Sequence, residues 1–348
     1  MRRAPLPPAP GTAPTARAVL RRITPLAGAI LMLAACGRGD GRGAPVRITV
    51  PYGAAFSQVS DSLARRDIIS SGFVFKLYGR LKGGTGSIQP GTYAFRPGTA
   101  WHRILRDLRE GNTMTLRLVI PEGWDLTRIA PRLAEITGKP ADTVLAVLTD
   151  SATAARLGVP GPTMEGYLYP ATYSFGMAVP LDTVLRQLVA TYRRVWTSAR
   201  RSRADSLGMS ERDVVTLASI VEKEAKVADE MPLIAAVYHN RLRIGMALQA
   251  DPTVQYALGR HQERLYYSDI DSVADNPYNT YRYPGLPPGP IGSPGERAID
   301  AVLQPAAAKY LYFVARPDGS HAFTASLDEH NRAKAAIRRA ERAAARNP

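Results

Sequence analysis

Two glutamates, Glu222 and Glu224, close the apolar segment 214–221, with Lys223 between them. Ser210 precedes this segment and Asp213 follows three positions later, which is the spacing of a helix N-cap with a capping box. A carboxyl group at the apolar edge of a helix loses hydration, so its pKa rises. A raised pKa keeps a proton available near neutral pH, as a general acid requires. The segment is therefore a candidate carrier of an acid catalyst.

The helical period separates the two glutamates. At 100° per residue, one apolar stripe contains Val214, Leu217, Ala218, Val221 and Ala225. Glu224 falls at the edge of this stripe, whereas Glu222 falls off it, towards the side of Val215. The period therefore favours Glu224 as the acid and gives Glu222 a pairing or supporting role. The helix alone favours the simpler interpretation, in which both glutamates lie on a solvated face.

Three further stretches combine aromatic rings with short polar side chains. They are residues 164–173, residues 238–253, and residues 278–281 with the proline-rich loop 285–295 that follows. Flat aromatic faces suit pyranose rings, and amide, hydroxyl and carboxylate groups suit sugar hydroxyls. Each stretch alone is also compatible with ordinary core and turns. With Glu222, the candidate substrate-binding residues are Glu165, Asn240, Gln249, Asp251, Asn279, Thr280 and Tyr281.

Composition limits the partners and cofactors. The 348 residues include 45 Lys and Arg against 30 Asp and Glu, a formal net charge of +15. Such a charge attracts anionic partners, or reflects an arginine-loaded surface. No zinc-finger spacing, basic zipper or aromatic RNA-binding stripe is present, so we expect no nucleic-acid partner. One cysteine and five scattered histidines without His-Glu-x-x-His predict neither a metal site nor a cofactor.

The first 36 residues are typical of an export signal. Five arginines precede an apolar run over 23–35, which ends in Leu33-Ala-Ala-Cys36. This ending resembles a bacterial lipoprotein cleavage box, in which the cysteine carries the lipids, so we expect lipidation at Cys36 and membrane attachment. An uncleaved signal anchor remains the alternative. The glycine-rich residues 37–45 predict a flexible linker.

The remainder predicts an α+β fold in two parts. A strand at 46–50, a helix from Phe56, a helix at 73–81, a strand at 89–95 and an apolar helical face closed by Gly111 are expected within 46–113. This βααβ outline resembles a small LysM-like carbohydrate-binding unit, although a structural platform fits it too. A strand at 115–120, a helix at 126–136 and short helices within 140–160 open a larger mixed α+β domain over 114–340. Residues 341–348 form a tail, and a surface helix is expected from Asp328 on.

The motifs together resemble the YceG-like family of endolytic murein transglycosylases. In chain order the matching pieces are Glu165-Gly-Tyr-Leu-Tyr-Pro, Ala218-Ser-Ile-Val-Glu-Lys-Glu224, Asn240-Arg-Leu-Arg-Ile-Gly-Met, Leu248-Gln-Ala-Asp-Pro-Thr-Val254, Tyr278-Asn-Thr-Tyr281, Gly285-Leu-Pro-Pro-Gly289 and Tyr310-Leu-Tyr-Phe-Val-Ala315. The resemblance covers about residues 45–340. It implies a LysM-like subdomain, a YceG-like catalytic domain, cleavage within glycan strands and Glu224 as the catalytic glutamate. Many members begin with a transmembrane helix, whereas this chain begins with a lipoprotein-type signal.

The resemblance also implies a mechanism with one carboxyl group. Glu224 would protonate the oxygen between MurNAc and GlcNAc and then take the proton of the MurNAc C6 hydroxyl, which closes a 1,6-anhydro ring. Asn240, Gln249, Asp251, Thr280 and Tyr281 would hold the sugar. The implied setting is the cell envelope, on the inner membrane facing the periplasm, with peptidoglycan synthases as partners and nascent strand length as the controlled quantity. The alternatives are a muramidase-type hydrolase in which Asp251 activates water, and a non-catalytic peptidoglycan-binding lipoprotein.

Overall fold

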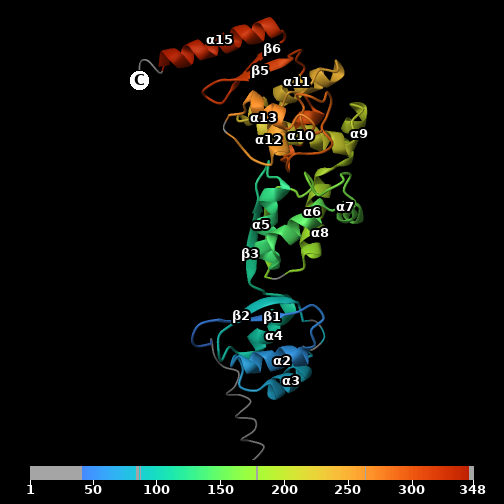
Figure 1. The fold of residues 1–348 in the computed structure, drawn as a ribbon. Coiled ribbons are helices and arrows are strands. Elements are labelled where there is room, and N and C mark those ends of the chain that lie inside the picture. The colour runs from blue at the N-terminus through green and yellow to red at the C-terminus, as the bar shows by residue number, and fades with distance from the viewer. Residues whose placement is uncertain (1–40, 84–85, 87, 178, 263, 345–348) are drawn as a thin grey trace, which may run out of the picture. The chain divides into compact units, whose positions relative to one another are not determined.

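A computed structural model of the chain describes residues 41–83, 86, 88–177, 179–262 and 264–344 (Figure 1). Its contacts divide it into two units, Met1–Thr115 and Leu116–Pro348. The expected export signal and Cys36 lie outside the described residues. Of the expected linker, residues 41–45 are described. Here the Arg42 N–H donates to the Pro97 carbonyl, and the Arg96 guanidinium donates to the Gly43 carbonyl.

The first unit pairs two strands and packs three helices. Its elements are β1 (Val46–Val50), α2 (Phe56–Arg65), α3 (Gly72–Leu81), β2 (Gly91–Phe95) and α4 (Trp101–Glu110). The strands are antiparallel, with Val46 opposite Phe95 and Val50 opposite Gly91. The alternation expected at 46–50 is present, since Ile48 and Val50 are buried. The apolar helical face expected before Gly111 is confirmed on α4, where Trp101, Ile104, Leu105 and Leu108 are all buried in the core of this unit.

The second unit is mostly helical, with two small sheets. Its elements are β3 (Thr115–Ile120), α5 (Leu126–Thr137), α6 (Ala141–Thr149), α7 (Ser151–Leu157), β4 (Ala171–Gly176), α8 (Leu181–Val195), α9 (Ser198–Ser206), α10 (Glu211–Glu224), the 3₁₀ turn η1 (Ala228–Glu230), α11 (Met231–Arg243), α12 (Asp251–Leu258), α13 (Tyr267–Ser272), α14 (Glu296–Leu303), β5 (Tyr312–Ala315), β6 (His321–Thr324) and α15 (Leu327–Ala344). Strand β3 pairs with β4, and β5 pairs antiparallel with β6. The mixed α+β class expected from the sequence is thereby confirmed.

Helix α10 is the centre of this unit. It packs against α9, α11, α12 and α14, and every residue from Val214 to Val221 is buried. The predicted one-sided stripe was therefore wrong in extent, because neighbouring helices and the loop 285–295 together cover the residues on and off the stripe. The expected cap is confirmed: Ser210 and Asp213 form a capping box at its N-terminus. The helix ends at Glu224, so its last turn presents the two candidate glutamates.

Within the part of the chain that is described, no helix has the length and apolar content needed to cross a membrane.

Candidate active site

Glu224 lies partly buried at the C-terminal end of α10, facing α11. Its Oε1 accepts a hydrogen bond from the Tyr238 hydroxyl at 3.0 Å. The pKa of Glu224 is raised to about 7: burial is the largest cause and the nearby negative charge of Asp251 acts in the same direction, while Tyr238 and Arg241 oppose the rise. A carboxyl group with this pKa keeps its proton in a large share of molecules at neutral pH, as a general acid must.

Asp251 supplies a second carboxylate. It is the first residue of α12, is exposed, and accepts a hydrogen bond from the Tyr281 hydroxyl at 2.5 Å. The turn that carries it is fixed by Thr280, whose buried hydroxyl accepts the Ala250 N–H at 3.0 Å and lies 2.8 Å from the hydroxyl of Thr253. Burial and the interaction with Asp251 raise the pKa of Tyr281, so this phenol remains a donor.

Gln249 precedes this turn in a conformation that is uncommon for a residue with a side chain. Its φ is +48°, in the left-handed region, and its N–H donates to the Thr280 carbonyl at 3.0 Å. The side chain is exposed and forms no hydrogen bond with the rest of the described chain. Strained backbone of this kind is often found where a side chain must be aimed at a ligand. Gln249 thus has a free amide beside Asp251.

Arg241 lies one turn after Tyr238 on α11 and ties three segments together. Its side chain is buried and donates to the Leu248 carbonyl at 2.5 Å and to the Leu311 carbonyl at 2.7 Å, while the guanidinium lies 5.5 Å from the centre of the Tyr312 ring. Its positive charge lowers the pKa of Glu224. Tyr238 and Arg241 were not among the expected site residues, although their i, i+3 spacing on a helix was a usable signal.

Glu222 faces a different segment. Its Oε2 accepts the Gly295 N–H at 2.9 Å, at the end of the proline-rich loop 285–295. The same loop is held along α10 by Ser219, whose hydroxyl accepts the Ile291 N–H at 3.0 Å. Burial raises the pKa of Glu222 as well, so the two glutamates do not differ in the way their predicted positions on a stripe suggested.

Glu165 lies between α7 and β4 in the chain, and its buried carboxyl group contacts the start of α5. One oxygen accepts the Leu126 N–H at 3.2 Å and the Tyr256 hydroxyl at 3.1 Å, and the other is buried with no hydrogen-bond partner among the described residues. Burial raises the pKa of Glu165 to about 8. The next residue, Gly166, has a φ of +82°, and a Cβ there would lie 2.5 Å from the Pro290 ring, so only glycine fits.

Asn240 and Asn279 are both buried and their amides are engaged. Asn240 donates to the carbonyls of Ala308 and Tyr310, each at 2.9 Å, and accepts from Arg243 at 2.7 Å. Asn279 donates to two carbonyls in the segment 270–273 and accepts the Tyr281 N–H at 3.1 Å. Through these bonds both side chains hold backbone segments in position, and they retain little hydrogen-bonding capacity for a ligand.

Of the expected residues, the structure brings together Glu224, Asp251 and Tyr281. Gln249 lies in the turn before Asp251, and Thr280 holds that turn in place. Glu165, Glu222, Asn240 and Asn279 hold other segments in place. Over the described residues, no three or more His, Cys, Asp or Glu side chains form a group able to hold a metal ion.

Comparisons with known proteins show the family of this chain. Residues 48–336 match the model of the YceG-like family. A Bacillus subtilis protein named endolytic murein transglycosylase is 34% identical over 305 residues, which are 83% of this chain and 84% of that protein. A Streptococcus pneumoniae protein of the same name is 27% identical, and the match covers 82% of this chain but 57% of that longer protein.

A solved structure gives the same result. The crystal structure of a YceG-like protein from Listeria monocytogenes superposes with a TM-score of 0.56 at 34% identity, covering 84% of this chain and 99% of that one. The sequence matches and the shared fold agree with each other over most of the described residues. The chain belongs to the YceG-like family.

Proposed function

We propose that this chain is an endolytic lytic transglycosylase, which cleaves MurNAc–GlcNAc bonds within peptidoglycan strands and leaves 1,6-anhydroMurNAc ends. The name shared by its relatives supports the class of reaction. The observation that carries the proposal is the state of Glu224, a partly buried carboxyl group whose pKa is raised to about 7. Such a group can give up a proton in one half of the reaction and accept one in the other.

The reaction balances with one carboxyl group. Glu224 donates its proton to the glycosidic oxygen as the bond from that oxygen to the MurNAc anomeric carbon breaks, releasing GlcNAc with a free 4-hydroxyl. The MurNAc C6 hydroxyl then attacks the same anomeric carbon and gives its proton to the Glu224 carboxylate. No water enters, and the acid is restored. Because the nucleophile belongs to the same sugar, proximity replaces a second catalytic carboxylate.

The neighbours of Glu224 have distinct roles in this scheme. The Asp251 carboxylate stabilises the positive charge that develops on the anomeric carbon, and the Tyr281 hydroxyl holds that carboxylate in place. Gln249 offers its unused amide to sugar hydroxyls beside them. Tyr238 keeps the Glu224 carboxyl oriented. Arg241 fixes the segment before Gln249 through the Leu248 carbonyl.

A muramidase-type hydrolase is the second candidate, and the exposure of Asp251 is the observation that favours it. An exposed carboxylate close enough to raise the pKa of Glu224 is also placed to activate a water molecule. The products separate the two reactions, because hydrolysis leaves reducing MurNAc ends and transglycosylation leaves anhydro ends.

The test is a digest of purified peptidoglycan by the full chain in detergent, read by mass spectrometry beside Glu224→Gln. We expect internal fragments with 1,6-anhydroMurNAc ends from the wild type and at least a 100-fold loss with Glu224→Gln, since the amide cannot donate a proton in the same way. Glu329→Gln on α15 is a matched control. Reducing ends would instead identify the hydrolase, and intact glycan with retained binding would leave a non-catalytic peptidoglycan-binding protein.

We assign carbohydrate binding to the first unit, as a LysM-like subdomain. Its strand, helix, helix, strand order supports this, and it exposes two aromatic side chains, Tyr52 and Phe73, that can stack on sugar rings. In the Glu224→Gln background, Tyr52→Ala with Phe73→Ala should reduce retention on insoluble peptidoglycan, whereas Tyr267→Ala, which removes an exposed ring from the second unit, should not. Equal retention would make the unit a structural platform.

We further place the protein in the cell envelope, lipidated at Cys36 and attached to the inner membrane facing the periplasm, where it would limit the length of nascent strands beside peptidoglycan synthases. The Leu-Ala-Ala-Cys box supports the lipid. Cys36→Ser should release the protein from the membrane fraction or leave its signal uncleaved. Cross-linking in growing cells should capture a synthase, and longer glycan strands should follow loss of Glu224.

A further inference from the structure

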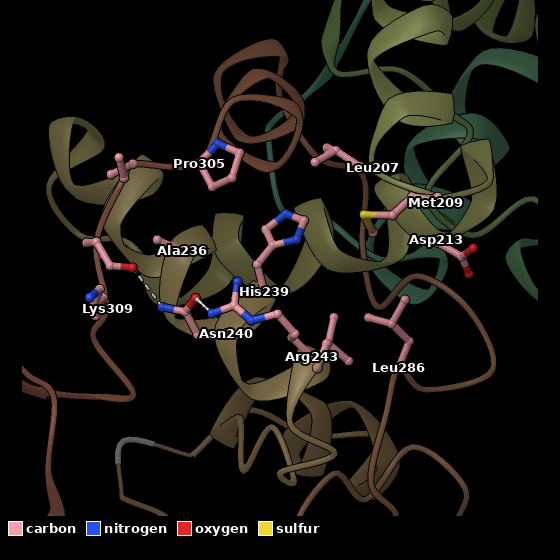
Figure 2. Close-up of a pocket in the computed structure, with 15 residues that line it drawn as sticks. Leu207, Met209, Asp213, Ala236, His239, Asn240, Arg243, Leu286, Pro305 and Lys309 are labelled. Atoms are coloured by element: carbon pink, nitrogen blue, oxygen red, sulfur yellow. Dashed lines mark hydrogen bonds between the residues drawn. The ribbon is translucent and has the colours of Figure 1, made fainter.

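A groove of about 1000 Å³ opens on the second unit, beside α11 (Figure 2). His239, Asn240 and Arg243 line it from α11, whereas Tyr238, which bonds to Glu224, and Arg241 do not. Neither Glu224, Asp251 nor Tyr281 is among its lining residues. The groove is therefore a separate feature that the proposed reaction does not use.

Much of the groove surface is apolar and built from small groups. Leu207, Met209 and Ala236 contribute apolar side chains, and the segment Pro305–Ala308 contributes small ones. Figure 2 shows Pro305 and Leu207 above the His239 ring, with Leu286 beyond Arg243. Such a surface offers close van der Waals contact to small apolar side chains.

The charge in the groove is positive. Arg243 and Lys309 are exposed and form no ion pair with any described carboxylate. Asp213 is the single acid in the lining, and its carboxylate is already engaged by the N–H and hydroxyl of Ser210 at 3.0 and 2.7 Å. Burial lowers the pKa of His239, and the positive charges of Arg203 and Arg243 lower it further, as expected in a positive field.

His239 adds a hydrogen-bond acceptor. Its Nε2 lies 2.8 Å from the Val302 carbonyl, and because a carbonyl only accepts, Nε2 carries the proton. A neutral ring then has a lone pair on Nδ1, which can accept an N–H from a ligand. The groove thus offers an acceptor for backbone N–H, two cations for carboxylates and an apolar surface for small side chains.

From this combination we propose that the groove binds a short acidic peptide with small apolar side chains. Resting on the proposed function, the inference assigns this peptide to the substrate, as the branch that the glycan strand carries. Helix α11 presents Tyr238 to Glu224 and the next residue, His239, to the groove. A helix is about 10–12 Å across with its side chains, a distance that three or four extended residues span. A bound branch would hold the strand at the acid.

The direct test is calorimetric titration of the full chain, carrying Glu224→Gln, with the acidic peptide released from the same peptidoglycan. We expect saturable binding that weakens roughly five- to tenfold in Arg243→Gln with Lys309→Gln, and to a similar extent when the peptide carboxylates are amidated. Arg338→Gln with Arg339→Gln, which removes two exposed cations from α15, is the charge-matched control and should not change the affinity. Equal affinity in the groove variant, or equal binding of the amidated peptide, overturns the proposal.

A second measurement separates this inference from the proposed function. With intact Glu224, the wild type should cleave peptide-bearing strands with a lower KM than strands stripped of peptides, and the groove variant should lose that difference while its kcat on stripped strands stays the same. Absence of anhydro ends from every substrate would refute the proposed function and leave the titration result standing. Anhydro ends with an unchanged KM difference in the groove variant would refute the peptide site alone.

Discussion

The hydroxyl of Tyr281 donates to the carboxylate of Asp251 at 2.5 Å, and this carboxylate is the neighbouring charge that raises the pKa of Glu224. The two neighbours of Glu224, Asp251 and Tyr238, act on its pKa in opposite directions. Asp251 disfavours the ionised form of Glu224, whereas the Tyr238 hydroxyl bonds to it and favours it. A pKa of about 7 is the balance of these effects with burial, and each can be changed by one substitution.

Asp251→Asn should move the alkaline limb of the pH profile of kcat/KM to lower pH by roughly half a unit to one unit. Glu224 donates only when protonated, so activity falls as pH rises through its pKa, and removing the neighbouring negative charge lowers that pKa. Digestion rates of glycan strands between pH 5 and 9 measure the limb. An alkaline limb that stays in place would show that the charge of Asp251 does not contribute to the pKa of Glu224.

Tyr238→Phe should move the same limb in the opposite direction. Loss of the 3.0 Å hydrogen bond removes a group that stabilises the ionised carboxylate, so the pKa of Glu224 rises above 7 and activity persists to higher pH. At pH 6, kcat should fall roughly 3- to 30-fold because the carboxyl loses its orientation. Tyr283→Phe, which alters a half-exposed phenol that is not hydrogen-bonded to the residues of the site, is the matched control. A shift to lower pH would contradict this account.

The local elements of this fold could be read from the sequence, because alternation and capping act over a few residues. The strand at 46–50 and the cap at Ser210 are both as predicted. The extent of burial around α10 could not be read in this way. Val215 and Thr216 fall off the predicted stripe and are nevertheless buried, because α10 packs against elements from other parts of the chain, such as α11, α12 and α14.

The site was predictable in part for the same reason. Glu224 and Asp251 were identifiable by type and by their places in motifs. The hydrogen bond from Tyr238 and the free amide of Gln249 depend on how α11 and the turn before α12 meet α10. Asn240 shows the reverse case: its residue type suited a sugar, but long-range packing brings two carbonyls from 308–310 to its amide.

Asn240→Ala should lower the stability of the second unit and leave the chemistry nearly intact. The change leaves the partly buried carbonyls of Ala308 and Tyr310 without this donor, at a cost of about 2–4 kcal/mol in the free energy of unfolding. Denaturant unfolding measures this loss, and kcat on glycan strands should change less than threefold below the transition. A large rise in KM without loss of stability would restore Asn240 to the substrate site.

Glu165→Gln should remove a pH dependence of stability. The folded pKa of about 8 exceeds the ordinary value of 4.5, so the folded state holds a proton that the unfolded state releases between these values. Stability contributed by the protonated carboxyl is complete below about pH 4.5 and is lost as pH rises towards 8.

The glutamine stays neutral and can still accept the Leu126 N–H and the Tyr256 hydroxyl. Thermal unfolding at pH 5 should therefore differ little between the two proteins, whereas at pH 8.5 the variant should melt several degrees higher. A variant that is equally destabilised at both pH values would show that Glu165 is ionised in the folded protein, with its charge compensated by groups such as Lys223.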